Sequence, residues 1–281
     1  MGLSDSFDGN ESRYFSFNKI YVIETLHTDE KQTGKALFDD LLHRTTYRHG
    51  WFDASYEFAK NKKQLFRALQ RIKLDAISGK IFPFIHIEGH GNATGLEVGK
   101  DNTRGIVKWE ELTNAFRKIN IATKNNLMLS VASCYGSNIY KGIRISERAP
   151  FFGFVAPVEE VTFGEIAEGY NAFFDRIINT TEFDDAVLTL RGAFNGRAPR
   201  FTYIHCETLF RKVADNILEE WRDPIENKKS LLGAITRNMS NVHVRLKYSI
   251  PQIIENCTHA VSQRENYLQN WHDNFLMKDL Q

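Results

Sequence analysis

Residues 81–91 read IFPFIHIEGHG and residues 126–136 read NLMLSVASCYG, and these two stretches decide the fold. In each of them an apolar run of strand length ends in a short segment that contains glycine. A continuous apolar strand is typical of burial on both faces, which occurs in parallel sheets that are covered by helices. We therefore predict an α/β fold with a largely parallel central sheet.

Similar runs on either side complete a set of six predicted strands. These are Lys19–Leu26, Trp51–Ala59, Ile81–Glu88, Asn126–Ser133, Pro150–Pro157 and Phe201–Cys206. The segments between them place apolar residues at helical spacing, which predicts crossover helices. These helices are expected over Gly34–His49, Asn61–Ser78, Trp109–Ile119, Glu165–Ile178 and Asp184–Leu190.

The pattern changes from Leu209 onward to long helical segments without strand runs. We therefore divide the chain into a polar N-terminal segment (1–17), an α/β domain (18–208) and a helical C-terminal region (209–281). The last segment repeats apolar residues every seven positions, at Ile254, Val261, Leu268 and Phe275. Such a stripe fits either a coiled-coil seam for a partner or packing against the chain's own α/β domain.

Composition bounds the function of this chain of 281 residues. Its 36 Lys and Arg residues balance 35 Asp and Glu residues, which argues against a dedicated nucleic-acid binder. The three cysteines are too few and too widely spaced for a disulfide scaffold. The first 17 residues are polar and no apolar run approaches the length that spans a bilayer, so we expect a cytoplasmic protein that uses neither membrane nor nucleic acid.

His90 and Cys134 are the candidate catalytic residues. Each follows an apolar strand, and ligands collect at the carboxyl ends of parallel strands, so the two side chains are expected to meet there. A thiolate attacks acyl carbons, and a nearby imidazole activates the thiol or protonates the leaving group. A helix that begins at Tyr135 would favour the thiolate further. The N–H groups of Gly91 and Cys134 are expected to face a developing oxyanion.

These strand ends resemble those of the caspase-like cysteine peptidases of clan CD, in which one strand ends in His-Gly and another in Ala-x-Cys-x-Gly. The matching residues are Gly89-His90-Gly91 and Ala132-Ser133-Cys134-Tyr135-Gly136. A Gly-His-Gly run ahead of an Ala-x-Cys run is similar to the bacterial CHAT branch, and the resemblance covers about residues 19–206. Ser133 and Tyr135 depart from the pattern of true caspases.

The resemblance implies a caspase-like three-layer sandwich and endopeptidase activity, with Cys134 as nucleophile and His90 as general acid and base. It implies no metal and no other cofactor. It also implies that loops beyond the cysteine strand line the substrate pocket, where Glu159 or Glu160 would face a basic side chain before the scissile bond. Bacterial enzymes of this kind are often defence or signalling effectors, so the helical region would dock an activating protein.

Alternatives to this interpretation remain open. A caspase-like fold without activity would serve as a peptide-binding or protein-binding module. His86, Glu88 and His90 alternate along one strand and offer a set of metal ligands, although no further ligand cluster follows them. Residues 28–35 (TDEKQTGK) lack the first glycine and the hydroxyl residue of a phosphate-binding loop. The basic segment 60–73 is explained by a solvated helix face.

Overall fold

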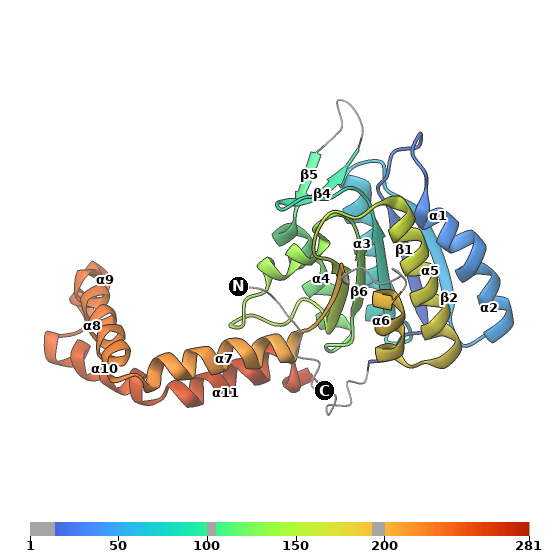
Figure 1. Ribbon diagram of the computed structural model, residues 1–281. Helices are drawn as coiled ribbons and strands as arrows, with labels where there is room; N and C mark the ends of the chain where they lie inside the picture. The colour runs from blue at the N-terminus through green and yellow to red at the C-terminus, as the bar shows by residue number, and fades with distance from the viewer. Residues whose placement is uncertain (1–14, 100–104, 193–199, 281) are drawn as a thin grey trace.

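The computed structural model of the protein describes residues 15–99, 105–192 and 200–280. The predicted N-terminal segment 1–17 therefore lies outside the described residues except for Phe15, Ser16 and Phe17. Strands and helices alternate through the first two thirds of the described chain, and helices alone make up the rest (Figure 1).

Six strands form the central sheet in the order β2-β1-β3-β6-β7-β8. Their bounds are β1 (Lys19–Glu24), β2 (Asp53–Phe58), β3 (Pro83–Glu88), β6 (Met128–Ala132), β7 (Gly153–Pro157) and β8 (Phe201–His205). All neighbouring pairs are parallel except β7 and β8, which run antiparallel. The predicted α/β class and the six-stranded, largely parallel sheet are confirmed. The antiparallel edge strand β8 was not predicted.

Helices cover both faces of the sheet and give three layers (Figure 1). On one face lie α1 (Thr33–Leu37), α2 (His43–His49), α5 (Phe163–Thr180) and α6 (Phe183–Gly192), with a π-helical turn over Phe38–Leu42 joining α1 to α2. On the other face lie α3 (Lys62–Ile77) and α4 (Trp109–Ala122). The arrangement is compatible with a three-layer sandwich, and each predicted crossover helix has a counterpart in it.

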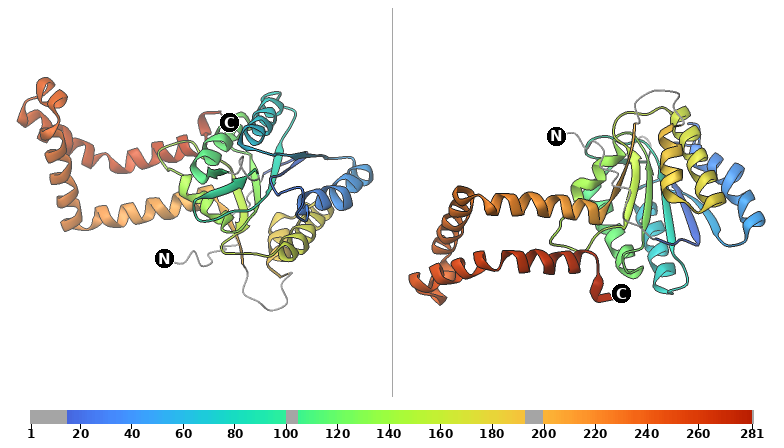
Figure 2. Two further views of the ribbon diagram at one scale, coloured as in Figure 1. Left: turned by 90° about the horizontal axis from the view of Figure 1, so that it is seen from above. Right: turned by 60° about the horizontal axis from the view of Figure 1, so that its bottom comes forward.

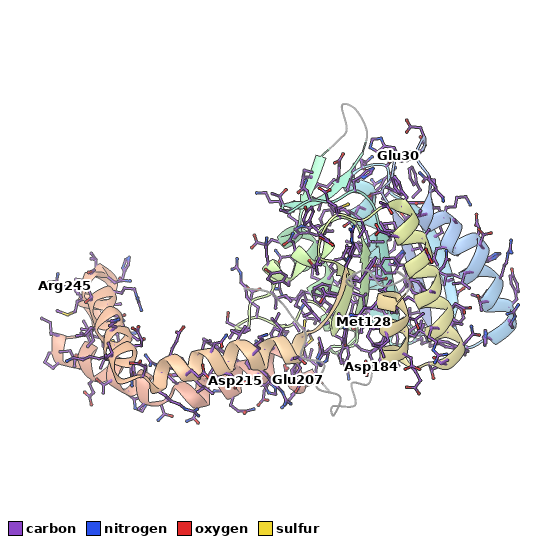
Figure 3. All side chains as sticks on the ribbon, in the orientation of Figure 1. Glu30, Met128, Asp184, Glu207, Asp215 and Arg245 are labelled. Carbon is purple, nitrogen blue, oxygen red and sulfur yellow. The ribbon has the colours of Figure 1, made fainter. Side chains whose placement is uncertain are left out.

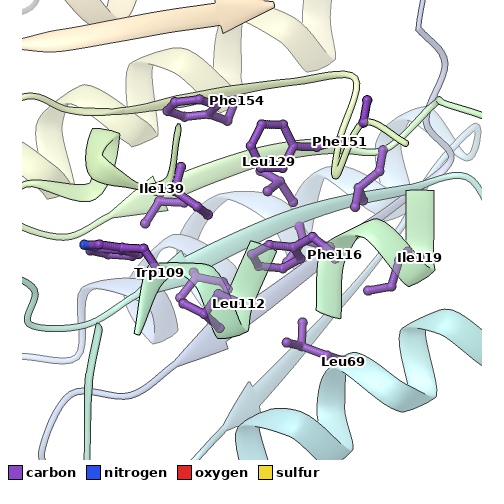
Figure 4. Close-up of a cluster of buried hydrophobic side chains, with 14 of the residues drawn as sticks. Leu69, Trp109, Leu112, Phe116, Ile119, Leu129, Ile139, Phe151 and Phe154 are labelled. Carbon is purple, nitrogen blue, oxygen red and sulfur yellow. The ribbon is translucent and has the colours of Figure 1, made fainter. Parts of the chain in front are cut away.

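Successive side chains of each strand point to opposite faces of the sheet, so the buried core consists of two clusters, one on each face. Along β1, Ile20 and Val22 face the α1–α5 side, whereas Tyr21 and Ile23 face the α3–α4 side. Figure 4 shows part of the cluster on the α3–α4 face, in which Phe116 of α4 lies among Leu69, Leu129 and other buried apolar side chains. Because every inner strand is buried on both faces, the continuous apolar runs in the sequence are explained.

A two-stranded hairpin stands above the carboxyl edge of the sheet, between β3 and α4. It consists of β4 (Gly95–Val98) and β5 (Gly105–Lys108), which pair antiparallel. The N–H of Glu97 donates to the carbonyl of His90 at 2.8 Å, so the hairpin is tied to the loop that carries this histidine. The hairpin connects β3 to the crossover helix α4.

The chain beyond β8 forms a helical arm that projects from the α/β body (Figures 1 and 2). The arm consists of α7 (Cys206–Arg222), α8 (Pro224–Ser240), α9 (Val242–Lys247), α10 (Ile250–Ser262) and α11 (Arg264–Phe275). Its root is packed into the body, because Phe210 of α7 and Phe275 of α11 lie in the same core cluster as the sheet. The N–H of Ala149 also donates to the carbonyl of Phe275 at 2.9 Å.

The seven-residue stripe of the last segment is split between two helices, because α10 ends at Ser262 and α11 begins at Arg264. Leu268 and Phe275 are buried against the body, as one of the two interpretations expected. Ile254 instead is 44% exposed in α10, near the far end of the arm. The stripe is therefore not a continuous seam.

Candidate active site

His90 and Cys134 follow neighbouring strands at matching positions. Strands β3 and β6 pair in parallel with Glu88 opposite Ala132, and each candidate residue lies two positions beyond this pair. The N–H of Gly89 donates to the carbonyl of Ala132 at 3.3 Å, so the two chains are still joined as they leave the sheet. The predicted meeting of the two strand ends is thus present in the structure.

A sharp turn exposes Cys134 at the end of β6. Tyr135 adopts a left-handed conformation with φ of 57°, which is strained for a residue with a side chain. The N–H of Tyr135 donates to the carbonyl of Glu159 at 3.1 Å, and this bond helps to hold the turn. The helix expected to begin at Tyr135 is a 3-10 helix over Gly136–Gly142, with Tyr135 as its N-cap residue. Cys134 therefore lies directly before the N-terminus of a helix, and the favouring of its thiolate by that helix stays a prediction.

His90 and Cys134 line one pocket of about 240 Å³ at this edge of the sheet. Val161, Phe163 and Glu88 also contribute to its wall. The Cys134 thiol donates to the carbonyl oxygen of Val161 at 3.6 Å. The ring of Phe163 packs edge-on against His90, with 5.9 Å between ring centroids. The loop that leads from β7 into α5 thus contacts Cys134, and the first residue of α5 contacts His90.

Glu30 orients the His90 ring. The Nε2 atom of His90 lies 2.8 Å from Glu30 Oε1, and the tautomer that donates from Nε2 leaves Nδ1 as the proton acceptor. Partial burial by itself raises the pKa of Glu30, but hydrogen bonds from His90 and from the His27 N–H outweigh burial and lower this pKa below its usual value. Glu30 is therefore ionised at neutral pH, and Figure 3 places it at the top of the α/β body.

Substituting Glu30 by glutamine is expected to lower the rate of any reaction that needs His90 by about tenfold, because a charge-assisted hydrogen bond becomes a weaker neutral one. In the unaltered protein the contact is present at neutral pH and is lost as the pH falls through the lowered pKa of Glu30. Glutamine does not titrate, so the variant should lack this part of the acid-side fall in rate.

The pH dependence of the rate, measured for the Glu30→Gln variant and for the unaltered protein, tests this prediction. Asp40→Asn is the matched control, because Asp40 is exposed and its only described ion pair is with Arg44 of the next turn. An unchanged profile in Glu30→Gln would show that Glu30 does not position His90.

Gly91 lies directly against the backbone of Cys134. A methyl group added at Gly91 would lie 2.6 Å from the carbonyl oxygen of Cys134, so only glycine fits without moving one of the two loops. Among the described residues, no acceptor is found for the N–H of Gly91 or of Cys134. Both predicted oxyanion donors are thus unengaged, and they come from adjoining loops.

Two buried carboxylates lie beneath the pocket. Glu88 lines the pocket and is 1% exposed, and Glu24 is fully buried at the same register of the neighbouring strand β1. Glu88 accepts a hydrogen bond from His86 Nε2 at 2.8 Å and another from the Thr33 hydroxyl. Burial raises the pKa of Glu24, and the charge of Glu88 raises it further, against hydrogen bonds from Tyr56 and the α1 backbone that lower it.

Glu159 and Glu160 lie outside this pocket. Both are exposed, and neither contributes to the pocket wall. Glu159 Oε1 forms an ion pair with Nε of Arg200 at 3.1 Å, and the carbonyl of Glu160 accepts a hydrogen bond from the same guanidinium at 3.0 Å. Glu159 contributes to the site only through its backbone, because its carbonyl accepts the hydrogen bond from Tyr135 in the turn after Cys134. The structure therefore does not bring these side chains to the catalytic residues.

The three alternating residues of β3 do not form one ligand set. His86 is fully buried, with Nδ1 at 2.7 Å from the Ser130 hydroxyl and Nε2 on Glu88, whereas His90 turns to Glu30. Across the described ranges, no three His, Cys, Asp or Glu side chains are grouped so that they could hold a metal ion. In the same ranges no helix has both the length and the apolar character needed to cross a membrane.

No model of a known protein family matches the chain, and a search of curated proteins finds no match.

Glu30, Glu88 and Phe163 belong to the site but were not predicted as parts of it. Glu88 had a visible signal, since a carboxylate at the end of the run FPFIHIE must be buried with a partner or face a pocket. Glu30 lies in a loop and Phe163 is the first residue of α5, and no pattern in the sequence around them indicates which strand ends they face. Only the sheet order, which puts β1 beside β3, brings Glu30 to His90.

Proposed function

We propose that this chain is a caspase-like cysteine endopeptidase of the CHAT type. The observation that carries the proposal is the pocket at the carboxyl edge of the sheet, which His90 and Cys134 line together from the ends of two paired strands. A free thiol, an imidazole held by a carboxylate and two unengaged backbone N–H groups are the parts that acyl transfer needs.

In the proposed reaction the Cys134 thiol gives its proton to His90, and the sulfur forms a bond to the carbonyl carbon of the scissile peptide. The carbonyl oxygen becomes an oxyanion that accepts hydrogen bonds from the N–H groups of Gly91 and Cys134. The C–N bond then breaks as the leaving amine takes the proton from His90. Water, deprotonated by His90, attacks the thioester and releases the carboxylic acid and the thiol.

We infer that the substrate presents Lys or Arg before the scissile bond and that Glu88, rather than Glu159 or Glu160, receives it. The pocket volume of about 240 Å³ suits one long side chain. Glu88 and Glu24 place two carboxylates beneath it, and no Lys or Arg lines its described wall. A substrate cation would offset this buried negative charge, whereas an apolar side chain would not.

Glu88→Gln is expected to reduce the preference for Lys over norleucine at this position by at least about tenfold, because the buried charge is removed at constant side-chain size. The measurement is the ratio of kcat/KM for two peptides that differ only in that residue, so a general loss of rate cancels. Glu159→Gln is the control and should leave the ratio unchanged. A ratio near one in the unaltered protein, or a change caused by Glu159→Gln instead, would contradict the assignment.

The test of the function itself is cleavage of a diverse peptide library, read by mass spectrometry. Each cut reports the scissile bond and the residue before it. The resemblance to CHAT enzymes extends the proposal to a cytoplasmic effector in bacterial defence or signalling that a partner activates, so the library is also incubated with proteins encoded beside this one. Cutting at defined bonds supports the proposal.

The second candidate is a caspase-like module that binds a peptide or protein without cutting it. The observation that favours it is that the Cys134 thiol donates a hydrogen bond to the carbonyl of Val161. The two candidates differ in thiol reactivity near neutral pH. A peptidase should react with iodoacetamide at Cys134 much faster than at Cys206, whose pKa is raised by burial, or at the buried Cys257. Equally slow labelling of all three would favour the module.

A further inference from the structure

The far end of the helical arm is held away from the α/β body. We define the arm tip as α8, α9 and α10, residues 224–262. The 17 residues of α7 span about 25 Å, at 1.5 Å per residue, and lead from the core of the body, where Cys206 and Phe210 are buried, to the start of the arm tip. Figure 3 places Arg245 at the far end of the arm, opposite Glu30 of the site described above. The arm tip thus presents a surface that is distinct from the pocket.

Large apolar side chains are exposed on the arm tip. Leu246 is 81% exposed and Val242 is 67% exposed, one turn apart on α9. Ile225, Leu232 and Ile250 are each more than half exposed on the adjoining helices. Exposed apolar residues that occur singly need no explanation, but Val242 and Leu246 are neighbours on one helix, and exposed apolar neighbours of this kind are typical of interaction surfaces.

The arm tip also carries a net positive charge. Residues 224–262 contain five Lys and Arg residues and two acidic residues, Glu226 and Glu255, although the whole chain is balanced. Glu226 forms an ion pair with Lys229 at 2.5 Å. Arg245 and Lys247 flank Leu246 on α9, and both are exposed. No ion pair to Arg237, Arg245 or Lys247 is found among the described side chains. These basic groups therefore face solvent beside the exposed apolar ones.

A hollow of about 450 Å³ lies where the arm tip joins α7 and α11. Four aromatic side chains line it, Trp221, Tyr248, Tyr267 and Trp271, together with the buried Ile253. The Arg264 guanidinium lies 4.8 Å from the ring centroid of Trp221 and also donates to Asn227 and Ser230. These contacts hold Trp221 and Arg264 in place in the wall of the hollow. The hollow is therefore already formed and can accept an apolar side chain.

We propose that the arm tip binds an acidic segment of a partner protein that carries large apolar side chains, one of which enters the hollow. The charge of the partner follows from complementarity with the net positive arm tip, in which Arg245 and Lys247 are exposed beside Leu246. A protein segment fits better than a bilayer because the aromatic residues line a concave hollow instead of a protruding face. It fits better than nucleic acid because phosphates would leave Val242 and Leu246 uncovered. The inference concerns binding alone, so it stands or falls separately from peptide cleavage.

The experiment uses the full chain with Cys134→Ala, so that no peptide is cut. A displayed library of random 16-residue peptides is selected on this protein, and the dissociation constant of each enriched peptide is measured by fluorescence anisotropy. We expect enriched peptides with net negative charge and several Leu, Phe or Trp residues. The double substitution Arg245→Glu and Lys247→Glu should weaken the binding of these peptides at least tenfold. Added salt should weaken their binding to the protein without the two charge substitutions. Replacing Lys63 and Arg67 of α3 by Glu makes the same charge change elsewhere and should have less than a twofold effect.

A second variant tests the hollow without a change of charge. Ala234→Trp places a large side chain in the hollow and should weaken binding at least tenfold. Circular dichroism verifies the fold, and if this variant does not fold, the charge variants still decide. Enriched peptides that are neutral or basic, or that bind undiminished to the protein with both arm-tip charges reversed, would overturn the proposal. So would binding of phosphatidylserine vesicles or single-stranded RNA through these residues while no acidic peptide is enriched.

Discussion

Replacing Cys134 by alanine is expected to lower the rate of peptide cleavage by at least about a thousandfold, because the bond-forming sulfur is removed while the pocket and its hydrogen-bond donors remain. Cys134 is half-buried at the end of β6, and alanine fits the space without new contacts, so the fold should be unchanged. The measurement is the loss of library fragments in the variant, with circular dichroism to verify folding.

Cys257→Ala is the matched control, since Cys257 is buried in the arm and does not line the pocket. It should cut the same bonds at nearly the same rate. Cleavage that persists in Cys134→Ala would show that another group, or a contaminating peptidase, is responsible. If the unaltered chain cuts nothing and Cys134 is no more reactive than Cys257, the pocket is better described as a binding site.

The fold was largely predictable because its inner strands are buried on both faces and appear in the sequence as apolar runs. The edge strand β2 is partly exposed and alternates polar and apolar residues, and the helices follow from apolar spacing. The antiparallel direction of β8 was not predictable in this way, since burial pattern is independent of strand direction. The break between α10 and α11 was also missed, because the seven-residue stripe continues across it without a proline or glycine.

The candidate site was predictable only where it depends on strand ends. His90 and Cys134 follow two neighbouring buried strands, so their meeting could be inferred from parallel pairing alone. Glu159 and Glu160 were proposed from their place in a loop, and a loop position does not fix side-chain direction. The structure instead pairs Glu159 with Arg200, the residue just before β8. The acidic group beneath the pocket comes from inside β3, where Glu88 is buried.

The two catalytic candidates are each engaged by a neighbouring loop. The carbonyl of Val161, in the β7–α5 loop, accepts a hydrogen bond from the Cys134 thiol, and Phe163 at the start of α5 packs on His90. The β1–α1 loop supplies Glu30. Arg200 ties the first of these segments to the start of β8, which continues directly into α7 of the arm. The segment that contacts Cys134 is thus connected through Arg200 to the strand that leads into the arm.

Gly91→Ala is expected to reduce the cleavage rate by at least about a hundredfold, because displacing catalytic groups by about 1 Å has effects of this size. The added methyl group would lie 2.6 Å from the Cys134 carbonyl oxygen and 2.8 Å from the Ser133 hydroxyl oxygen. Since one of these contacts is with backbone, the loop that carries His90 must move away from the loop that carries Cys134. The free energy of unfolding should fall by only about 1–3 kcal/mol, as in other overpacked sites.

Gly164→Ala is the control for this substitution, because the nearest atom to its added methyl group is 3.9 Å away in Thr162, close to the same pocket. It should retain the unaltered rate. The decisive measurements are kcat/KM and thermal stability of both variants. Gly91→Ala should show a large loss of kcat/KM and only a small loss of stability, because the substitution separates two reacting groups and does not unfold the sheet. A Gly91→Ala enzyme that cuts within threefold of the unaltered rate would show that the close approach of the two loops does not position His90 against Cys134.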